Sequence, residues 1–144
     1  MAGPQPNLGF SQDAAIVLAL ADTAIPFAST REDEAERWVR VLRLHGQVGR
    51  VLQALGVGEA PLETLAQPPE TKTPRDPNEN VVADVATAAR KYAGGRGSDL
   101  VATVDVLFAI FEVYGSAFDR ALYVRGTTRD ELIERLAAAE TAPV

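Results

Sequence analysis

The chain has 144 residues, of which 47% are apolar and 24% charged, and its formal net charge is −6. Such a composition is typical of one globular domain, or of two small halves packed as one. The acidic balance argues against a nucleic-acid or anionic-membrane surface, which needs clustered positive charge. The absence of cysteine excludes disulfides, thiol catalysis and cysteine-ligated zinc.

The N-terminal residues predict a flexible tail. Residues 1–9 are rich in proline and glycine. They lack the basic start and apolar stretch of a secretory signal peptide, and the apolar runs further along are too short for a membrane-spanning helix. The cytoplasm is therefore the expected location.

Helical spacing predicts a mostly buried first helix. Ser11 is a favourable N-cap before an alanine- and leucine-rich stretch, and Pro26 ends the helix. Thr30 caps a second helix, which carries the expected core residue Trp38 and stops at Gly46.

Shorter helices complete the first half. A third is predicted to end at Gly56, and a short fourth holds Leu62 and Leu65. The next segment, residues 67–80, is rich in proline and nearly free of apolar groups, so it is expected to be a semi-extended linker.

The second half begins with helical spacing from Val82 to Tyr92, followed by a glycine-rich loop at 94–97. Val101 to Val113 is rich in β-branched and aromatic residues, so a strand is an alternative there. A match to the helical first half, with Thr103 as a cap, favours a helix. The last helix opens with a capping box at 128–131. About eight helices and an all-α fold are expected.

A sequence pattern occurs twice, starting 70 residues apart. Both copies have leucine at +2, glycine at +6 and leucine at +12 from an arginine. Such a period predicts stacked units that share one core. The matching positions are Arg50, Leu52, Gly56 and Leu62 in one copy, and Arg120, Leu122, Gly126 and Leu132 in the other. The expected organisation is a tail at 1–9, a repeat at 10–66, a linker at 67–80, a second repeat at 81–139 and a tail at 140–144.

With the repeat laid out, the chain resembles the N-terminal domain of the Clp (Hsp100) protein unfoldases over roughly residues 8–139. Residues 10–21 resemble its opening, an aromatic and a Ser/Thr before an alanine- and leucine-rich helix. Residues 50–57 match the family's R-V-L-x-x-L-G-V, 89–92 its A-R-K-L, and 101–108 its V-G-T-E-H-L-L-L. The resemblance implies two tandem four-helix repeats with pseudo-two-fold symmetry.

The resemblance also implies binding without catalysis. Domains of this family dock adaptor proteins and substrates ahead of an ATPase ring, and some bind phosphorylated arginine or cyclic peptide antibiotics. The phosphoarginine site depends on the glutamate of a T-E-H segment in each repeat. In the second copy that position is Val104, and in the first the segment is the degenerate Glu34-Ala35-Glu36, so this recognition is expected to be lost or weak. By analogy, a groove between the halves would hold Phe10, Ser11, Glu34, Glu36, Thr103 and Asp105, with both Glu34 and Asp105 as surface acids.

Other motifs favour structural roles. No P-loop is present, and His45 as the lone histidine supports neither a metal cluster nor a triad, so it is expected to cap a helix C-terminus. The loop at 94–97 is a weak candidate phosphate cradle and a better helix end. Arg50 and Arg120 are expected to bond helix carbonyls or acids and fix the packing of the repeats. No enzyme activity, metal or cofactor is expected.

Two functions remain open on these grounds. The first is a non-catalytic module of the Clp protease system that binds a Clp unfoldase, an adaptor or a substrate, either as a stand-alone protein or as part of an unfoldase. The second is a protein that binds or sequesters a small molecule such as a cyclic peptide antibiotic.

Overall fold

The structure, a computed structural model, describes the backbone of residues 9–57 and 80–141 and the side-chain burial of residues 9–57 and 80–138. The predicted helix with Leu62 and Leu65, the proline-rich linker up to residue 79 and most of both predicted tails lie outside the described residues. Within them the chain is mostly helical, as predicted, with seven α-helices.

The first half begins with α1 (Gln12–Ala24) and a short 3-10 helix η1 (Ile25–Phe27), followed by α2 (Arg31–Arg43) and α3 (Gly46–Ala54). Both predicted N-caps are confirmed. The Ser11 hydroxyl accepts a hydrogen bond from the Ala14 N–H at 3.2 Å, and the Thr30 hydroxyl accepts one from Asp33 at 3.0 Å. These side chains satisfy backbone donors that a helix start leaves free.

The prediction that α1 is mostly buried is wrong. One face, with Ala14, Val17 and Ala21, is fully buried, whereas Ala15 and Leu20 on the opposite side are exposed. The apolar residues on every face of α1 led to too high an estimate of its burial, because several of them are alanines. Alanine is compatible with an exposed helix surface as well as with a core.

The second half contains α4 (Val81–Gly95), α5 (Thr103–Tyr114), α6 (Ser116–Tyr123) and α7 (Arg129–Thr141). The helix prediction for the segment up to Val113 is confirmed, but Thr103 is its first helical residue and not its cap. Ala102 stands at the cap, and the Asp105 carboxylate accepts a hydrogen bond from its N–H at 2.9 Å. At the start of α7, the Thr128 hydroxyl accepts from the Glu131 N–H at 3.2 Å, as half of the predicted capping box requires.

Two short strands were not predicted. β1 (Gly9–Phe10) and β2 (Leu100–Val101) pair in parallel, with Phe10 opposite Val101. The Ser11 N–H extends this pairing by donating to the Val101 carbonyl at 2.8 Å. Two residues are too few to show the alternation that identifies a strand in a sequence.

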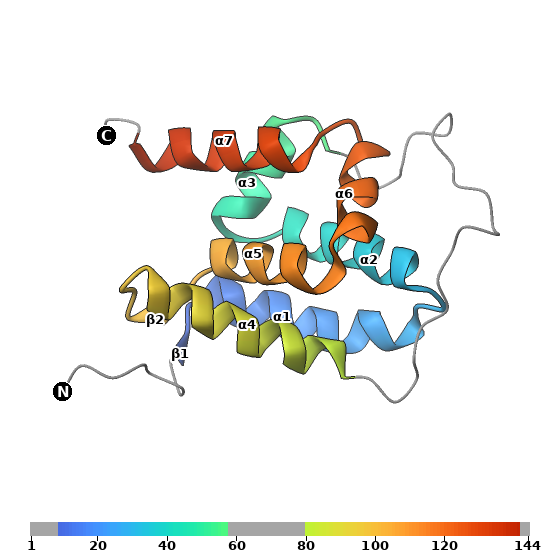
Figure 1. Ribbon diagram of the computed structural model, residues 1–144, viewed down its shortest axis with the longest axis horizontal. Coiled ribbons are helices and arrows are strands. Elements are labelled where there is room, and N and C mark those ends of the chain that lie inside the picture. Colours follow the sequence, from blue (N-terminus) through green and yellow to red (C-terminus); the bar gives the residue numbers. More distant parts are fainter. Residues whose placement is uncertain (1–8, 58–79, 142–144) are drawn as a thin grey trace.

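The helices lie in three tiers (Figure 1). α1 and α4 contact each other along one side, α2 and α5 lie in the middle, and α3, α6 and α7 cover the other side. α5 is the most central element, because it contacts α1, α2, α3, α4 and α6. No helix in the described ranges is long and apolar enough to cross a membrane.

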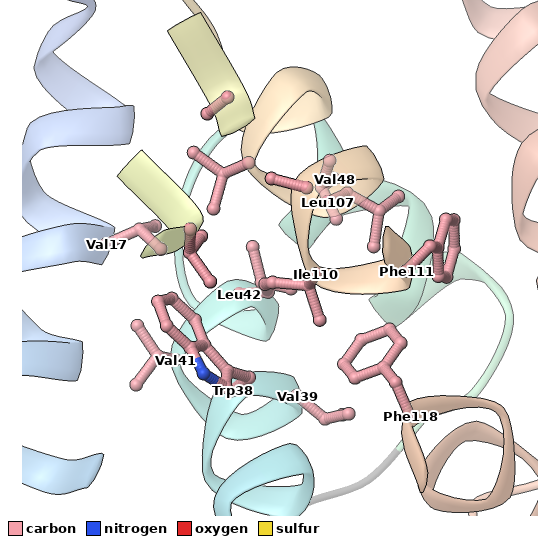
Figure 2. Close-up of a cluster of buried hydrophobic side chains, with 14 of the residues drawn as sticks. Val17, Trp38, Val39, Val41, Leu42, Val48, Leu107, Ile110, Phe111 and Phe118 are labelled. Carbon is pink, nitrogen blue, oxygen red and sulfur yellow. The ribbon is translucent and has the colours of Figure 1, made fainter. Parts of the chain in front are cut away.

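One hydrophobic core runs through these tiers. Trp38 is fully buried, as predicted, and so is Ile110 on the facing α5. The rings of Phe111 and Phe118 meet edge to face, with centroids 5.5 Å apart, and join α5 to α6. Figure 2 shows part of this core, to which α1, α2, α3, α5 and α6 all contribute side chains. The labelled members are Val17, Trp38, Val39, Val41, Leu42, Val48, Leu107, Ile110, Phe111 and Phe118.

Candidate functional site

Four of the six predicted site residues gather where β1 and β2 pair. Phe10 and Ser11 precede α1, and Thr103 and Asp105 form the first turn of α5. The Arg90 guanidinium of α4 lies over the Phe10 ring, 4.9 Å from its centroid, in a cation–π contact. Phe10 and Ser11 are partly exposed, so they are the members of this group that a ligand could reach.

Asp105 is fully buried, so the prediction of a surface acid is wrong. Its two carboxylate oxygens accept hydrogen bonds from Arg96 Nε at 2.8 Å and Nη2 at 2.6 Å. One of them also accepts the Ala102 N–H. The carboxylate therefore caps α5 and holds Arg96 in a bidentate ion pair.

The glycine-rich loop has a structural role in this pair. Gly94 and Gly95 end α4, and Gly97 adopts φ +72° just after Arg96. The turn brings the Arg96 side chain back over the start of α5. This placement fits the structural interpretation of the loop better than a phosphate cradle.

Thr103 is 3% exposed because Gly46, the first residue of α3, packs against it. A Cβ placed on Gly46 would come within 2.8 Å of the Thr103 side chain, and Gly46 also has φ +73°. Any larger residue there would force α3 away from α5. The Thr103 hydroxyl therefore lies under α3 and away from solvent.

Glu34 is also buried, with 1% exposure, and the prediction of a surface acid is wrong there too. Its Oε1 accepts a hydrogen bond from the Tyr114 hydroxyl at 2.9 Å, and that hydroxyl accepts one from Trp38 Nε1 at 2.9 Å. The Arg31 guanidinium lies 4.9 Å from the centroid of the Tyr114 ring, and its Nη2 donates to the Val113 carbonyl. This buried network joins α2 to the end of α5.

The burial of this network changes the pKa of the Tyr114 hydroxyl. Removal from water raises the pKa of the Tyr114 hydroxyl well above its ordinary value of 10.0, and the nearby charge of Glu34 raises it further. Both effects disfavour a phenolate, so Tyr114 remains a neutral donor to Glu34.

Glu36 lies on another side of α2, where it faces α6. Its carboxylate, 30% exposed, accepts a hydrogen bond at 3.3 Å from Arg125, whose side chain is fully buried. Burial lowers the pKa of Arg125, and the negative charge of Glu36 opposes that effect. The arrangement is an ion pair between α2 and the end of α6.

The six residues therefore do not share one exposed surface. Asp105 lies in the first turn of α5 and Tyr114, the partner of Glu34, at its end, nine residues and roughly 14 Å along the helix axis. Sequence spacing alone gave no sign of this separation, because it depends on how α2 crosses α5.

His45 and the acidic residues belong to the types that can form a metal site or a helix cap. His45 follows Leu44, the C-cap residue of α2, so it lies at a helix C-terminus as predicted, but its imidazole makes no hydrogen bond among the described residues and a capping bond is not shown. Within residues 9–57 and 80–141, no group of three or more histidine, aspartate or glutamate side chains could hold a metal ion.

The prediction that Arg50 and Arg120 bond to helix carbonyls or acids is wrong for the described part of the chain. Both side chains are exposed, and neither guanidinium has a hydrogen bond or ion pair in the part of the chain that the structure describes. Each lines a separate open pocket. Arg50 lines one of about 490 Å³ between α3 and α7, and Arg120 lines one of about 530 Å³ between α6 and the start of α7. The 70-residue spacing pointed to these positions but not to their exposure.

The pocket at Arg120 also contains a second arginine, but that one is paired. Arg129 forms a bidentate ion pair with Asp119, at 2.8 and 3.1 Å, and lies 4.5 Å from the centroid of the Phe111 ring. With Asp119 and Asp130 both in its lining, this pocket has mixed charge. The pocket at Arg50 differs, because its lining among the described residues includes no acid.

Comparison with known proteins gives no family for this chain: no protein-family model matches it, and no curated protein matches it either.

Proposed function

We propose that the chain is a non-catalytic protein- or peptide-binding module of the Clp protease system, folded as two tandem repeats like the N-terminal domain of a Clp unfoldase. It would dock a substrate or an adaptor, or regulate a Clp unfoldase, and so act in regulated proteolysis in the cytoplasm.

The observation that carries this proposal is a helix ending found at the matching position of both halves. At the end of α3 the Val57 N–H donates to the Leu52 carbonyl at 3.0 Å, with Gly56 between them at φ +82°. At the end of α6 the Thr127 N–H donates to the Leu122 carbonyl at 3.1 Å, past Gly126 at φ +92°. These are equivalent Schellman endings, 70 residues apart.

The same ending also closes α4, where the Ser98 N–H donates to the Ala93 carbonyl at 3.0 Å past Gly97. What supports a repeat is therefore the 70-residue offset of the endings of α3 and α6, together with the order of the helices around them.

The packing of the helices supports the same interpretation. α3 of the first half contacts α5 of the second, and α6 of the second half contacts α2 of the first. Within each half, the first long helix contacts the second: α1 with α2, and α4 with α5. Such a reciprocal exchange is what two equivalent units related by a two-fold axis would produce.

The pairing of Asp105 supports the loss of phosphoarginine recognition. A carboxylate reads an arginine ligand through two parallel hydrogen bonds. Asp105 already makes both of these bonds to Arg96 of its own chain and is closed to solvent. An arginine ligand would have to displace Arg96, so binding of free phosphoarginine is expected to be undetectable at millimolar concentration.

The test is capture from a lysate of the source cell with the purified chain as bait, read by mass spectrometry. Recovery of a Clp unfoldase, its peptidase or its adaptor is expected. The variant Phe10→Ala, which removes the partly exposed aromatic ring of β1, is expected to reduce that recovery. Phe27→Ala is the matched control, because Phe27 is 79% exposed and lies beyond the other end of α1.

Capture without any Clp component, by a bait with an intact thermal transition, would contradict the proposal. A cyclic peptide titration of the same chain then tests the second function. Tight binding of the cyclic peptide together with failure to capture Clp components would favour a sequestering protein.

A further inference from the structure

The pocket between α3 and α7 has the composition of a binding site for an anion attached to an apolar group. Its lining is Gln47, Arg50, Val51 and Ala54 from α3, with Arg135 and Ala138 from α7. Its volume of about 490 Å³ lies within the range of roughly 300–1,000 Å³ that is common for pockets with small ligands.

The two arginines of this pocket differ from four others in the described part of the chain. Arg37, Arg96, Arg125 and Arg129 each form an ion pair with an acid. Arg50 and Arg135 line one pocket together, and neither has a hydrogen bond or ion pair within the described ranges. Two like charges in the same pocket repel each other, and an anion between them would remove that repulsion.

Two acids of α7, Glu131 and Glu134, precede Arg135 within one turn, and neither forms an ion pair with it among the described residues. The Oε1 of Glu131 accepts a hydrogen bond from the Thr127 hydroxyl at 2.7 Å. Within the part of the chain that the structure describes, no ion pair compensates the charge of Arg50 or Arg135, in a protein whose net charge is −6.

The rest of the lining indicates what the anion is attached to. Val51, Ala54 and Ala138 are apolar, and Gln47 can donate and accept a hydrogen bond. An apolar side chain fits against the first three, and a peptide group fits the amide. An inorganic anion would use the arginines only.

We propose that this pocket binds a peptide segment in which a carboxylate lies next to an apolar side chain. The carboxylate accepts hydrogen bonds from Arg50 and Arg135, and the apolar side chain packs on Val51, Ala54 and Ala138. A C-terminal carboxylate and the side chain of an acidic residue both offer this chemistry. The inference rests on the pocket alone and stands or falls independently of the proposed Clp function.

The experiment is a titration of the full ¹⁵N-labelled chain, followed by the shifts of its backbone amide signals. One probe is an N-acetylated tetrapeptide of three alanines and a C-terminal leucine with a free carboxylate, and its partner is the same peptide with a C-terminal amide. A third peptide, amidated, carries aspartate beside leucine. The carboxylate peptides are expected to shift signals of α3 and α7, the more strongly at low salt, whereas the amidated alanine–leucine peptide leaves them unchanged.

Arginine variants identify the residues that carry the binding. Arg50→Ala and Arg135→Ala are each expected to weaken the affinity for the carboxylate peptides about tenfold or more, since each removes a charge-assisted hydrogen bond. Arg120→Ala is the matched control, because this exposed arginine lines the other pocket. It is expected to leave the affinity within about twofold.

Three results would overturn the inference. One is equal binding of the free-carboxylate and amidated forms of the alanine–leucine peptide. Another is that inorganic phosphate binds as tightly as the carboxylate peptides, which would mean a simple anion site. The third is unchanged affinity in both Arg50→Ala and Arg135→Ala when their thermal transitions match that of the unaltered chain. The two carboxylate peptides reveal whether the anion comes from a chain end or an acidic side chain, and binding of either supports the proposal.

Discussion

At the scale of single residues, two acids of the candidate binding site are buried and stabilise the fold. Asp105 and Glu34 are removed from water, and each is hydrogen-bonded to a side chain of another element. A buried carboxylate needs such partners, because leaving it unpaired in a low-dielectric interior costs several kcal/mol, of order 3–5. Both carboxylates therefore act mainly on stability.

We expect Asp105→Ala to lower the free energy of unfolding by about 2–3 kcal/mol, because it removes the cap of α5 and the ion pair with Arg96. Urea unfolding followed by circular dichroism measures the change. The exposed acid Glu134 offers a control, and Glu134→Ala should stay within about 0.5 kcal/mol. The double variant with Arg96→Ala should cost less than the two single changes added together. A neutral Asp105→Ala would show that the carboxylate is not structural.

The Trp38–Tyr114–Glu34 network predicts a dependence on alkaline pH. Burial and the charge of Glu34 raise the pKa of Tyr114, whereas an unfolded tyrosine loses its proton near pH 10.0. Above that pH the unfolded state binds fewer protons than the folded state, so stability falls as pH rises. The slope is about 1.4 kcal/mol per pH unit for each such group. The pKa of Tyr92 is also raised, by its hydrogen bond to Glu112, and adds in the same direction.

Tyr114→Phe separates these contributions. It should cost about 1–3 kcal/mol at neutral pH, because Trp38 loses its acceptor and Glu34 loses a donor. It should also make the fall in stability above pH 10 less steep. Denaturant unfolding of both proteins between pH 7 and 11 measures both effects. An equal slope in the two proteins would show that Tyr114 ionises normally when folded.

At the scale of elements, helix ends depend on glycines that adopt positive φ. Gly56 and Gly126 end α3 and α6 in this conformation, which an L-residue with a Cβ adopts only at a cost. A Cβ on either glycine would meet no atom within 4 Å. The requirement for glycine at both positions is therefore set by the backbone and not by space.

We expect Gly126→Ala to destabilise the protein by about 1–2 kcal/mol, from the left-handed backbone alone. Gly94→Ala is the matched control, because Gly94 lies in α4 with ordinary φ and also has open space around it. That change should stabilise the protein by about 0.5–1 kcal/mol. Thermal and urea unfolding of both variants give the comparison. Equal effects would show that positive φ is not the cause.

At the scale of the whole molecule, the two halves share one core. The indole of Trp38 from the first half hydrogen-bonds to Tyr114 of the second, and Arg125 of the second pairs with Glu36 of the first. Contacts of α2 with α6 and of α3 with α5 add apolar area between the halves. Neither half has a complete set of partners for its apolar faces.

We therefore expect the full chain to unfold in one transition, with coincident curves from Trp38 fluorescence and far-ultraviolet circular dichroism. Residues 1–66 and 67–144, produced separately, should each show much less helix and no cooperative thermal transition. Mixing the two pieces should restore helix if the shared core drives folding. A cooperative transition in either isolated piece would show that the halves are independent domains.

The sequence by itself determined the helical class, the N-caps at Ser11 and Thr30, the stop at Pro26 and the glycine ending at 56. All of these depend on residues within a few positions of one another, so local physical chemistry is sufficient. The same local information favoured a helix between Val101 and Val113 over a strand. It failed at β1 and β2, where pairing joins residues about 90 positions apart.

Only the tertiary structure decided which charged residues are buried. Asp105 and Glu34 carry the same charge in the sequence as exposed acids, and their burial depends on Arg96 and Tyr114 arriving from other turns and helices. Arg50 and Arg120 show the reverse: their spacing indicated a structural pair, yet their helices leave both side chains exposed beside pockets. Burial and exposure depend on how helices cross, and that is a property of the assembled core, which no local pattern contains.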